Sequence, residues 1–526
     1  MDSIDSIHRF LGQDFSKAKS KYLNDRKVRY TDPFFSPCNE SFYHFSTRYQ
    51  RSNLRQVISK LSRRRKVEWT RPYKIWPNPC LFAHSQVNVP LVSQEYDSWF
   101  AISMACFSLR QDFTVKVFID RRYSDNYLSP ESPRYCGMIR FRFYIFGQWE
   151  EVIIDDKLPT INRQLVFMGS ENEGEFWPSL LEKAFAKVMG SYACLSVGDV
   201  GYGLTCLTAG MSRTYMLSDY HDDCKAKQKL LEQLQVAIRR QGLICLRVNL
   251  KDGAFSKFIG NGFISENPFC VTGCFVMPRD ALYLIHTGSN MLVKIKSCNS
   301  SNKEKWTGRW SEGDEVWEKL QPESQIKREL EFRTKGRGVF WMEFDDMIKH
   351  FDEMTICRQA CKYTYSQDAW DIAQIKSAWK SEYSAGGCAN NLETFINNPQ
   401  IQFKISQEET VNIVLEQHQK RVDGFEFYHI GFAVYKRDDG DSTEELKLPG
   451  YPYKLNGGVR IAQTKEYVNC RTVEEELELD KGTYVLIPST FNVNEENKFL
   501  VRILSEGEVN LIELNPKNKN KNKLTG

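Results

Sequence analysis

Residues 137–160 read GMIRFRFYIFGQWEEVIIDDKLPT, and this stretch fixes the local fold around it. Apolar Ile139, Phe141 and Phe143 alternate with arginines, which is the two-residue period of a strand with one buried face. The run FGQW then turns the chain into EEVIID. Two apolar runs joined by a glycine-containing turn predict an antiparallel hairpin.

Two helices flank this hairpin in the sequence. FWPSLLEKAFAKVMG at 176–190 has Pro178 in its first turn, apolar residues at a 3.6-residue period, and Gly190 to stop it. A second helix is predicted from Ser98 to about Leu109, where Asp97 can cap the first turn. Its aromatic and aliphatic residues give it a face to bury.

The later chain changes to a strand-rich pattern from about residue 199. LICLRVNL (243–250), ALYLIH (281–286) and NMLVKIK (290–296) have strand character, and TGSN predicts a hairpin between the last two. Beyond about residue 355 the apolar runs predict the antiparallel strands of a β-sandwich.

The bulk properties exclude several classes of protein. With 526 residues the chain exceeds one hydrophobic core and suggests about three or four domains. No run approaches the roughly 18 apolar residues of a spanning helix, and MDSIDSIHRF lacks an apolar signal core. These features predict a cytoplasmic protein. The net charge of +4 gives no reason to expect nucleic-acid binding.

The 15 cysteines form no C-x-x-C pair. The two C-x-x-x-C spacings, Cys270/Cys274 and Cys357/Cys361, lack companion histidines. We therefore expect buried free thiols in a reducing compartment and no cofactor, with a zinc site as the alternative.

Several motifs occur in the order found in one protease family. They are VEWTRP, GMIRFRFYIFGQWEEVIIDDKLPT, EFWPSLLEKAFAKVMGSY, WTGRWSEGDEVW, GVFWMEFDDMIKHF and AGGCANNLETFINNPQ. Over residues 67–505 the chain resembles the calpains, which are calcium-dependent cysteine proteases. The resemblance implies an α+β protein, in which a papain-like core of two subdomains with a cleft between them precedes an antiparallel β-sandwich.

The resemblance also implies domain boundaries. We expect an N-terminal segment at 1–66, core subdomains at 67–198 and 199–345, a sandwich at 346–510, and a disordered basic tail at 511–526. The chain ends about 20 residues after the last predicted strand. We therefore expect no counterpart of the EF-hand domain of calpains.

The catalytic motif departs from the calpain pattern. Calpains begin their first core helix with Q-G-x-L-G-D-C-W, and the matching stretch here is VSQEYDSW (92–99). Ser98 therefore occupies the nucleophile position, and Val92 occupies the position of the glutamine that stabilises the oxyanion. The general-base histidine of G-H-A-Y is matched to Cys274 in TGCFVM, and the orienting asparagine of R-N-P-W-G is matched to Ser297 in KSCN.

These substitutions remove the chemistry of acyl transfer. A serine hydroxyl is a poor nucleophile without a base that accepts its proton, and neither Cys274 nor Ser297 replaces an imidazole. We therefore predict a protein without peptidase activity, in which Ser98 is a hydroxyl at a helix start. The alternative is a rewired hydrolase that uses Cys274 with His286 as its base.

Calcium control is also expected to be lost, because calcium needs many oxygen ligands. The positions that match the calcium ligands of the resembled family are Val89, Glu175, Lys305, Glu312, Arg337 and Val339. Two of these six are carboxylates, and we expect both to be solvated surface acids.

The function class that fits best is a calpain-like pseudo-protease that binds protein partners as a regulator or scaffold. A cytoskeletal or membrane-associated scaffold is the other alternative. It would use the basic tail, with its KNKNKNK run, to contact acidic surfaces. The basic cluster Arg63–Lys66 could contact an anionic partner, or it could be a solvated segment leading into the core.

Overall fold

The structure is a computed structural model of the 526-residue chain. It describes residues 8–24, 28–62, 66–83, 90–91, 98–119, 128–170, 172–248, 258–259, 263–264, 269–278, 291–297, 306–320, 325–333, 338–360, 370–391, 393–422, 424–438, 440, 442, 444–446, 454–455 and 457–514.

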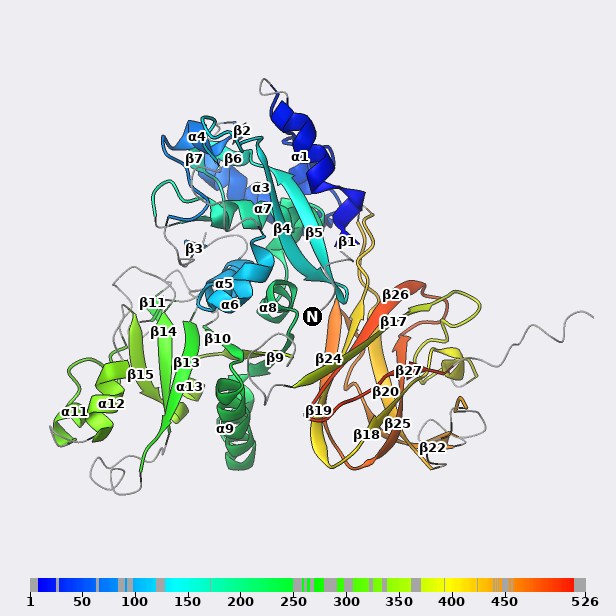
Figure 1. The fold of residues 1–526 in the computed structure, drawn as a ribbon. Coiled ribbons are helices and arrows are strands. Elements are labelled where there is room, and N and C mark those ends of the chain that lie inside the picture. Colours follow the sequence, from blue (N-terminus) through cyan, green and yellow to red (C-terminus); the bar gives the residue numbers. More distant parts are fainter. Residues whose placement is uncertain are drawn as a thin grey trace, which may run out of the picture. The chain divides into compact units, whose positions relative to one another are not determined.

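The chain divides into two compact units, Met1–Gln359 and Ala360–Gly526. Figure 1 shows helices and sheets in the first unit and mainly strands in the second. The described helices of the first unit are α1 (Phe15–Asn24), α2 (Glu40–Tyr43), α3 (Arg48–Ser62), α4 (Pro72–Ile75), α5 (Ser98–Ser108), α6 (Gln111–Val117), α7 (Trp177–Met189), α8 (Val200–Thr208), α9 (Cys224–Arg239), α11 (Val316–Lys319), α12 (Gln325–Arg333) and α13 (Phe344–His350).

The hairpin predicted from residues 137–160 is confirmed as β4 (Met138–Ile145) and β5 (Gln148–Asp155). Apolar side chains of both strands pack with α5, α7 and α8 in one large core cluster. The helices predicted for α5 and α7 are also confirmed, and Gly190 ends α7 with a positive φ of 121°. This helical layer holds the start of α5 in place.

Small sheets complete this part of the unit. β1 (His8–Arg9) pairs with β5, β2 (Glu68–Thr70) and β7 (Gln164–Leu165) flank β6 (Leu158–Ile161), and β3 (Pro90–Leu91) pairs with β8 (Gly169–Ser170). Five of the tryptophans in the sequence motifs, Trp99, Trp177, Trp306, Trp310 and Trp341, are at most 5% exposed.

A six-stranded sheet forms the second part of the first unit, in the order β15-β14-β13-β10-β16-β9. Its strands are β9 (Met211–Met216), β10 (Leu243–Arg247), β13 (Phe269–Val276), β14 (Met291–Ser297), β15 (Val339–Glu343) and β16 (Glu353–Arg358), and a separate pair is formed by β11 (Phe258–Ile259) and β12 (Phe263–Ile264). The 16-residue helix α9 packs against the sheet. The expectation of mostly strands from residue 199 therefore missed a long helix.

The hairpin predicted between ALYLIH and NMLVKIK is wrong. Over its length β14 pairs with β13 on one edge and with β15 on the other. A strand has two edges for backbone hydrogen bonds, so no edge of β14 is left for ALYLIH. ALYLIH itself lies outside the described residues.

The second unit confirms the predicted antiparallel sandwich. One sheet has the order β17-β26-β19-β24, and the other has the order β21-β22-β20-β25-β18-β27 with β23 beside β20. Inward-facing residues such as Phe403, Ile413, Phe432 and Val501 form one buried cluster between the strands. The strands are β17 (Asp371–Trp379), β18 (Ile401–Ile405), β19 (Glu409–Gln417), β20 (His429–Arg437), β21 (Lys454–Leu455), β22 (Gly458–Gln463), β23 (Val468–Asn469), β24 (Thr472–Leu479), β25 (Gly482–Thr490), β26 (Asn497–Ser505) and β27 (Ile512–Glu513).

Three of the expected boundaries differ from the structure. The first unit extends past 345 to Gln359, because β16 pairs between β10 and β9. The 1–66 segment is not separate from the core, since Phe35, Phe42 and Leu54 belong to its main cluster. The sandwich continues past 510, because β27 pairs with β18. None of the helices in the described part of the chain is both long and apolar enough to cross a membrane.

Candidate functional site

The position matched to the catalytic nucleophile is the first residue of α5. Ser98 is that residue, whereas Val92 lies outside the described residues. The next residue anchors the helix, because the Trp99 indole Nε1 donates a hydrogen bond to the Leu195 carbonyl oxygen at 2.7 Å. This hydrogen bond ties the first turn of α5 to the segment at Leu195.

The positions matched to the base and the orienting residue do not come together. In the β13–β14 ladder, Cys274 pairs with Val293, whereas Ser297 pairs with Phe269. Four residues of strand separate the two pairs, which corresponds to about 13 Å. A base must lie within hydrogen-bond reach of the group that orients it. The assignment of the base position to Cys274 is therefore inconsistent with that of Ser297.

The register points to another part of β13 for the base position. Phe269 lies opposite Ser297, and Asn267 and Pro268 precede it in the sequence outside the described residues. None of these three residues is a histidine. Ser297 is 4% exposed, and its backbone N–H donates to the Gly338 carbonyl oxygen at 2.8 Å. The hairpin thus buries Ser297 opposite Phe269, which has no imidazole.

Glu175 is not the surface acid that the sequence suggested. It is 3% exposed, and its Oε1 accepts a hydrogen bond from the Ala83 N–H at 2.8 Å. Its Oε2 accepts hydrogen bonds from the Ser170 hydroxyl and from the Asn172 amide. These contacts join Glu175 to the segment at Ala83 and to strand β8, so Glu175 has a structural role that its sequence position alone did not reveal.

Of the other positions matched to calcium ligands, the structure describes two. Glu312 is exposed, as expected. Val339 begins β15 and pairs with Lys296, so it offers no oxygen side chain. The remaining positions, together with the alternative base, lie outside the described residues: Val89, Lys305, Arg337 and His286.

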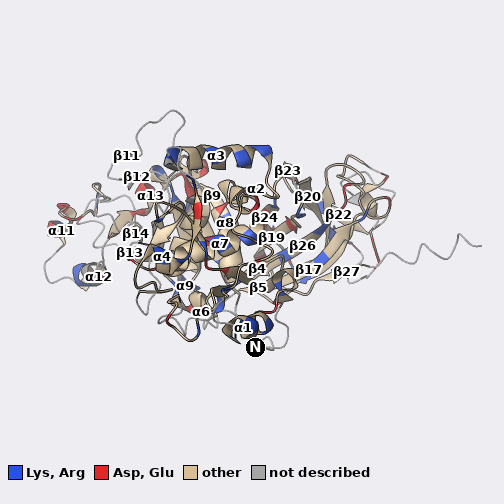
Figure 2. Ribbon diagram, turned by 90° about the horizontal axis from the view of Figure 1, so that it is seen from above, with Lys and Arg blue, Asp and Glu red and all other residues tan. Residues whose placement is uncertain are grey.

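The basic segments proposed as partner contacts are described in part. Lys66 is exposed, whereas residues 63–65 and the tail from 515 onward lie outside the described residues. Figure 2 shows further Lys and Arg residues along α3, which ends just before this cluster. The basic character near residue 66 therefore begins on a helix and not in the segment that the sequence singled out.

The described cysteines are free thiols, as the sequence predicted for them. In the first unit, seven of them are buried or partly buried besides Cys106, Cys245 and Cys270, and these three converge on one another.

Comparison with known proteins agrees with this fold. Residues 30–358 match the family described as calpain family cysteine protease, and residues 375–504 match calpain large subunit, domain III. Calpain-5 of Mus musculus is 30% identical over 518 residues, which are 95% of this chain and 76% of that protein.

Two further relatives give the same result. Calpain clp-1 of Caenorhabditis elegans is 26% identical and is covered to 62%, with 95% of this chain aligned. The calpain-2 catalytic subunit of Homo sapiens is 26% identical and is covered to 71%, with 94% of this chain aligned. The match therefore spans both units, and the chain belongs to the calpain family of cysteine proteases.

Proposed function

We propose that this chain is a pseudo-protease of the calpain family, which binds protein partners and cleaves no peptide bond. The observation that carries the proposal is the set of residues at the catalytic positions. Serine stands at the start of α5, and the hairpin residue opposite Ser297 is Phe269. A hydroxyl with no imidazole to accept its proton cannot support acyl transfer at a useful rate.

The preserved packing supports a role in binding. Large aromatic side chains fill the core of the first unit, and the second unit is a complete sandwich. Buried aromatic residues contribute several kcal/mol each to stability. A chain that keeps these residues and changes its reactive ones presents a stable folded surface, which suits recognition of other proteins.

The direct test is a cleavage assay with purified full-length protein. Casein and calpain-type peptides should remain intact at every calcium concentration, for the wild type and for Ser98→Cys. The single substitution should not restore activity, because loss of a triad member costs about a millionfold in turnover and a base would still be missing. Equal melting temperatures would show that both proteins are folded.

Two results would contradict the proposal. Calcium-dependent cleavage that disappears in Ser98→Ala would mean that the serine is an active nucleophile. Cleavage that survives in Ser98→Ala but disappears in Cys274→Ala would support the rewired hydrolase instead.

The binding half of the proposal is tested with the same variants. Partners recovered from native tissue by the wild type should also be recovered by the Ser98→Ala/Ser297→Ala double variant. Trp177→Ala should lose this recovery together with stability, because Trp177 is fully buried. If a folded double variant lost its partners, the side chains at the positions matched to the catalytic residues would still be needed for function.

A further inference from the structure

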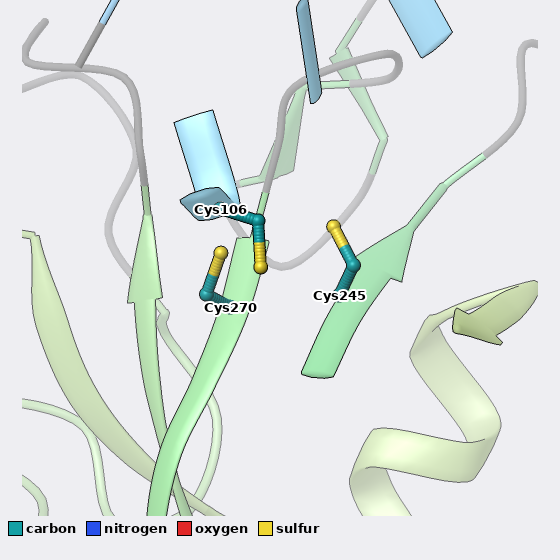
Figure 3. Close-up of side chains that lie close together, drawn as sticks. All are labelled: Cys106, Cys245 and Cys270. Carbon is teal, nitrogen blue, oxygen red and sulfur yellow. The ribbon is translucent and has the colours of Figure 1, made fainter. Parts of the chain in front are cut away.

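Three buried cysteines from separate parts of the sequence converge in the first unit. Cys106 lies on α5, Cys245 on β10 and Cys270 on β13, and each is at most 2% exposed. Their sulfur atoms all lie within 4.8 Å of one another. Figure 3 shows the helix and the two strands directing these sulfurs toward a common point. We refer to them as the three-cysteine cluster.

The sulfurs lie near enough to one another to share one metal ion, since each pair is at most 4.8 Å apart. Zinc–sulfur bonds are about 2.3 Å long, so two thiolates on one zinc ion lie roughly 3.8–4.0 Å apart. Thiolate ligands select Zn²⁺ and Cu⁺ over calcium and magnesium, which prefer oxygen.

The backbone brings the three cysteines together. Cys245 and Cys270 are direct partners in the β10–β13 ladder, and Cys106 reaches them from the helix that packs on the same sheet. A disulfide between the two strand cysteines would account for two of the sulfurs but not for the third. A single ion accounts for all three.

An approach to the cluster is also present. A cavity of about 280 Å³ is lined by Cys106 and Cys270 and also by Arg110, Gln241 and Thr272. Gln241 and Thr272 are exposed, so the cavity opens to the surface beside Cys106 and Cys270. It can admit an ion and leaves room for water as a further ligand, as the fourth position of zinc requires.

Metal binding to the three-cysteine cluster releases protons. Since the metal ligand is the thiolate, each thiol that binds transfers its proton to solvent as its S–H bond is replaced by a metal–sulfur bond.

We propose that Cys106, Cys245 and Cys270 bind one thiophilic metal ion, Zn²⁺ or Cu⁺, which ties α5 to the six-stranded sheet. Both ions prefer thiolate ligands, and separate titrations with each ion distinguish between them. The site uses neither Ser98 nor Ser297, so it stands whether or not the chain cleaves peptides. No change in oxidation state is involved.

The test uses full-length protein that has been stripped of metal and kept reduced with a phosphine. Zn²⁺ and Cu⁺ are titrated separately against a chromophoric competitor for each ion. One equivalent of at least one ion should bind to the wild type. Cys106→Ala, Cys245→Ala and Cys270→Ala should each weaken that binding by at least about 100-fold, because each removes one of three ligands.

Cys357→Ala is the matched control. Cys357 is fully buried on β16, in the same sheet and the same core cluster, but it is not one of the three converging cysteines. It should bind the ion as the wild type does. Melting curves in chelator identify any variant that fails to fold, and such a variant is left out of the comparison.

X-ray absorption of the metal-loaded wild type keeps the proposal testable without any variant. It should show about three sulfur neighbours, at about 2.3 Å if the ion is zinc. Selective binding of one ion assigns the site to that ion. Failure of the reduced wild type to bind either ion, binding unchanged in all three variants, or a coordination shell of oxygen and nitrogen would overturn the proposal.

Discussion

Two lysines of α7 have their ammonium groups in the interior of the first unit. Lys183 Nζ lies 2.7 Å from Asp155 Oδ1 and also donates to the backbone carbonyl of Lys157. Lys187 Nζ lies 2.6 Å from Asp32 Oδ2. All four charged side chains are 0% exposed. Because a buried charge is costly unless it is paired and hydrogen-bonded, these contacts make the two pairs interdependent parts of the core.

The sequence could not predict this arrangement of single residues. The 3.6-residue apolar period of α7 predicts a buried face, but the helix is buried almost all round. The partner Asp32 is 155 residues distant from Lys187, and no local pattern joins them. The same reason explains why Glu175 was assigned to the surface, since its donor Ala83 is 92 residues distant in the sequence.

We predict that Lys183→Ala lowers the free energy of unfolding of the first unit by about 3–5 kcal/mol, because the Asp155 carboxylate would stay buried without its cation. Lys227→Ala is the control, since Lys227 forms an exposed pair with Asp345 and should cost at most about 1 kcal/mol. Urea unfolding of both variants measures the difference. Equal losses would mean that Asp155 is satisfied by its other hydrogen-bond donors.

The helices α5 and α8 cross so closely that one position has no room for a side chain. A Cβ atom added to Gly203 would lie 2.4 Å from Ser103 Oγ and 2.8 Å from Ser103 Cβ. Ser103 is itself held, because its hydroxyl donates to the Trp99 carbonyl oxygen at 2.8 Å. This contact sets the depth at which α5 sits in the core, and therefore where Ser98 begins the helix.

Gly203→Ala should destabilise the first unit by about 1–3 kcal/mol, although alanine is the better helix former by about 1 kcal/mol. The cause is overpacking against Ser103, so adding Ser103→Gly should recover part of the loss. Gly273→Ala is the control, because its nearest neighbour would be an ordinary 3.8 Å away. The melting temperatures of the wild type, Gly203→Ala, Gly203→Ala/Ser103→Gly and Gly273→Ala measure these changes in stability. Full stability of Gly203→Ala alone would show that the helices can move apart freely.

Elements with a local signature were predicted from the sequence, and pairings between distant elements were not. The α5 and α7 helices and the β4–β5 hairpin follow from periodicity, proline and glycine positions within a few residues of one another. The partner of β14 depends on which distant strands compete for its two edges, so proximity in sequence gave the wrong choice. The assignment of the base position to Cys274 failed for the same reason. An ungapped motif match does not show which residue of β13 pairs with Ser297.

At the scale of the whole molecule, the motifs located both units but not their junction. The sequence placed the change at 345, whereas β16 returns into the six-stranded sheet and the first unit ends at Gln359. The local sequence of β16 does not show that this strand belongs to a sheet whose first strand, β9, lies more than a hundred residues earlier. The three-cysteine cluster is another product of this long-range assembly, since Cys270 meets Cys106 and Cys245 and not its sequence neighbour Cys274.

The effect of calcium on the melting temperature tests the prediction that calcium control is lost. Calcium takes about six to eight oxygen ligands, and Glu175 is already committed to three hydrogen-bond donors. We predict that saturating calcium leaves the melting temperature of the full chain unchanged relative to magnesium and to chelator. A site filled at a hundredfold excess over its Kd would add about 2.7 kcal/mol, which a melting curve detects easily. A rise in calcium alone would contradict the prediction. If Glu312→Gln then abolished that rise, the ion would be in the first unit, because Glu312 is the exposed acid that remains at a matched position.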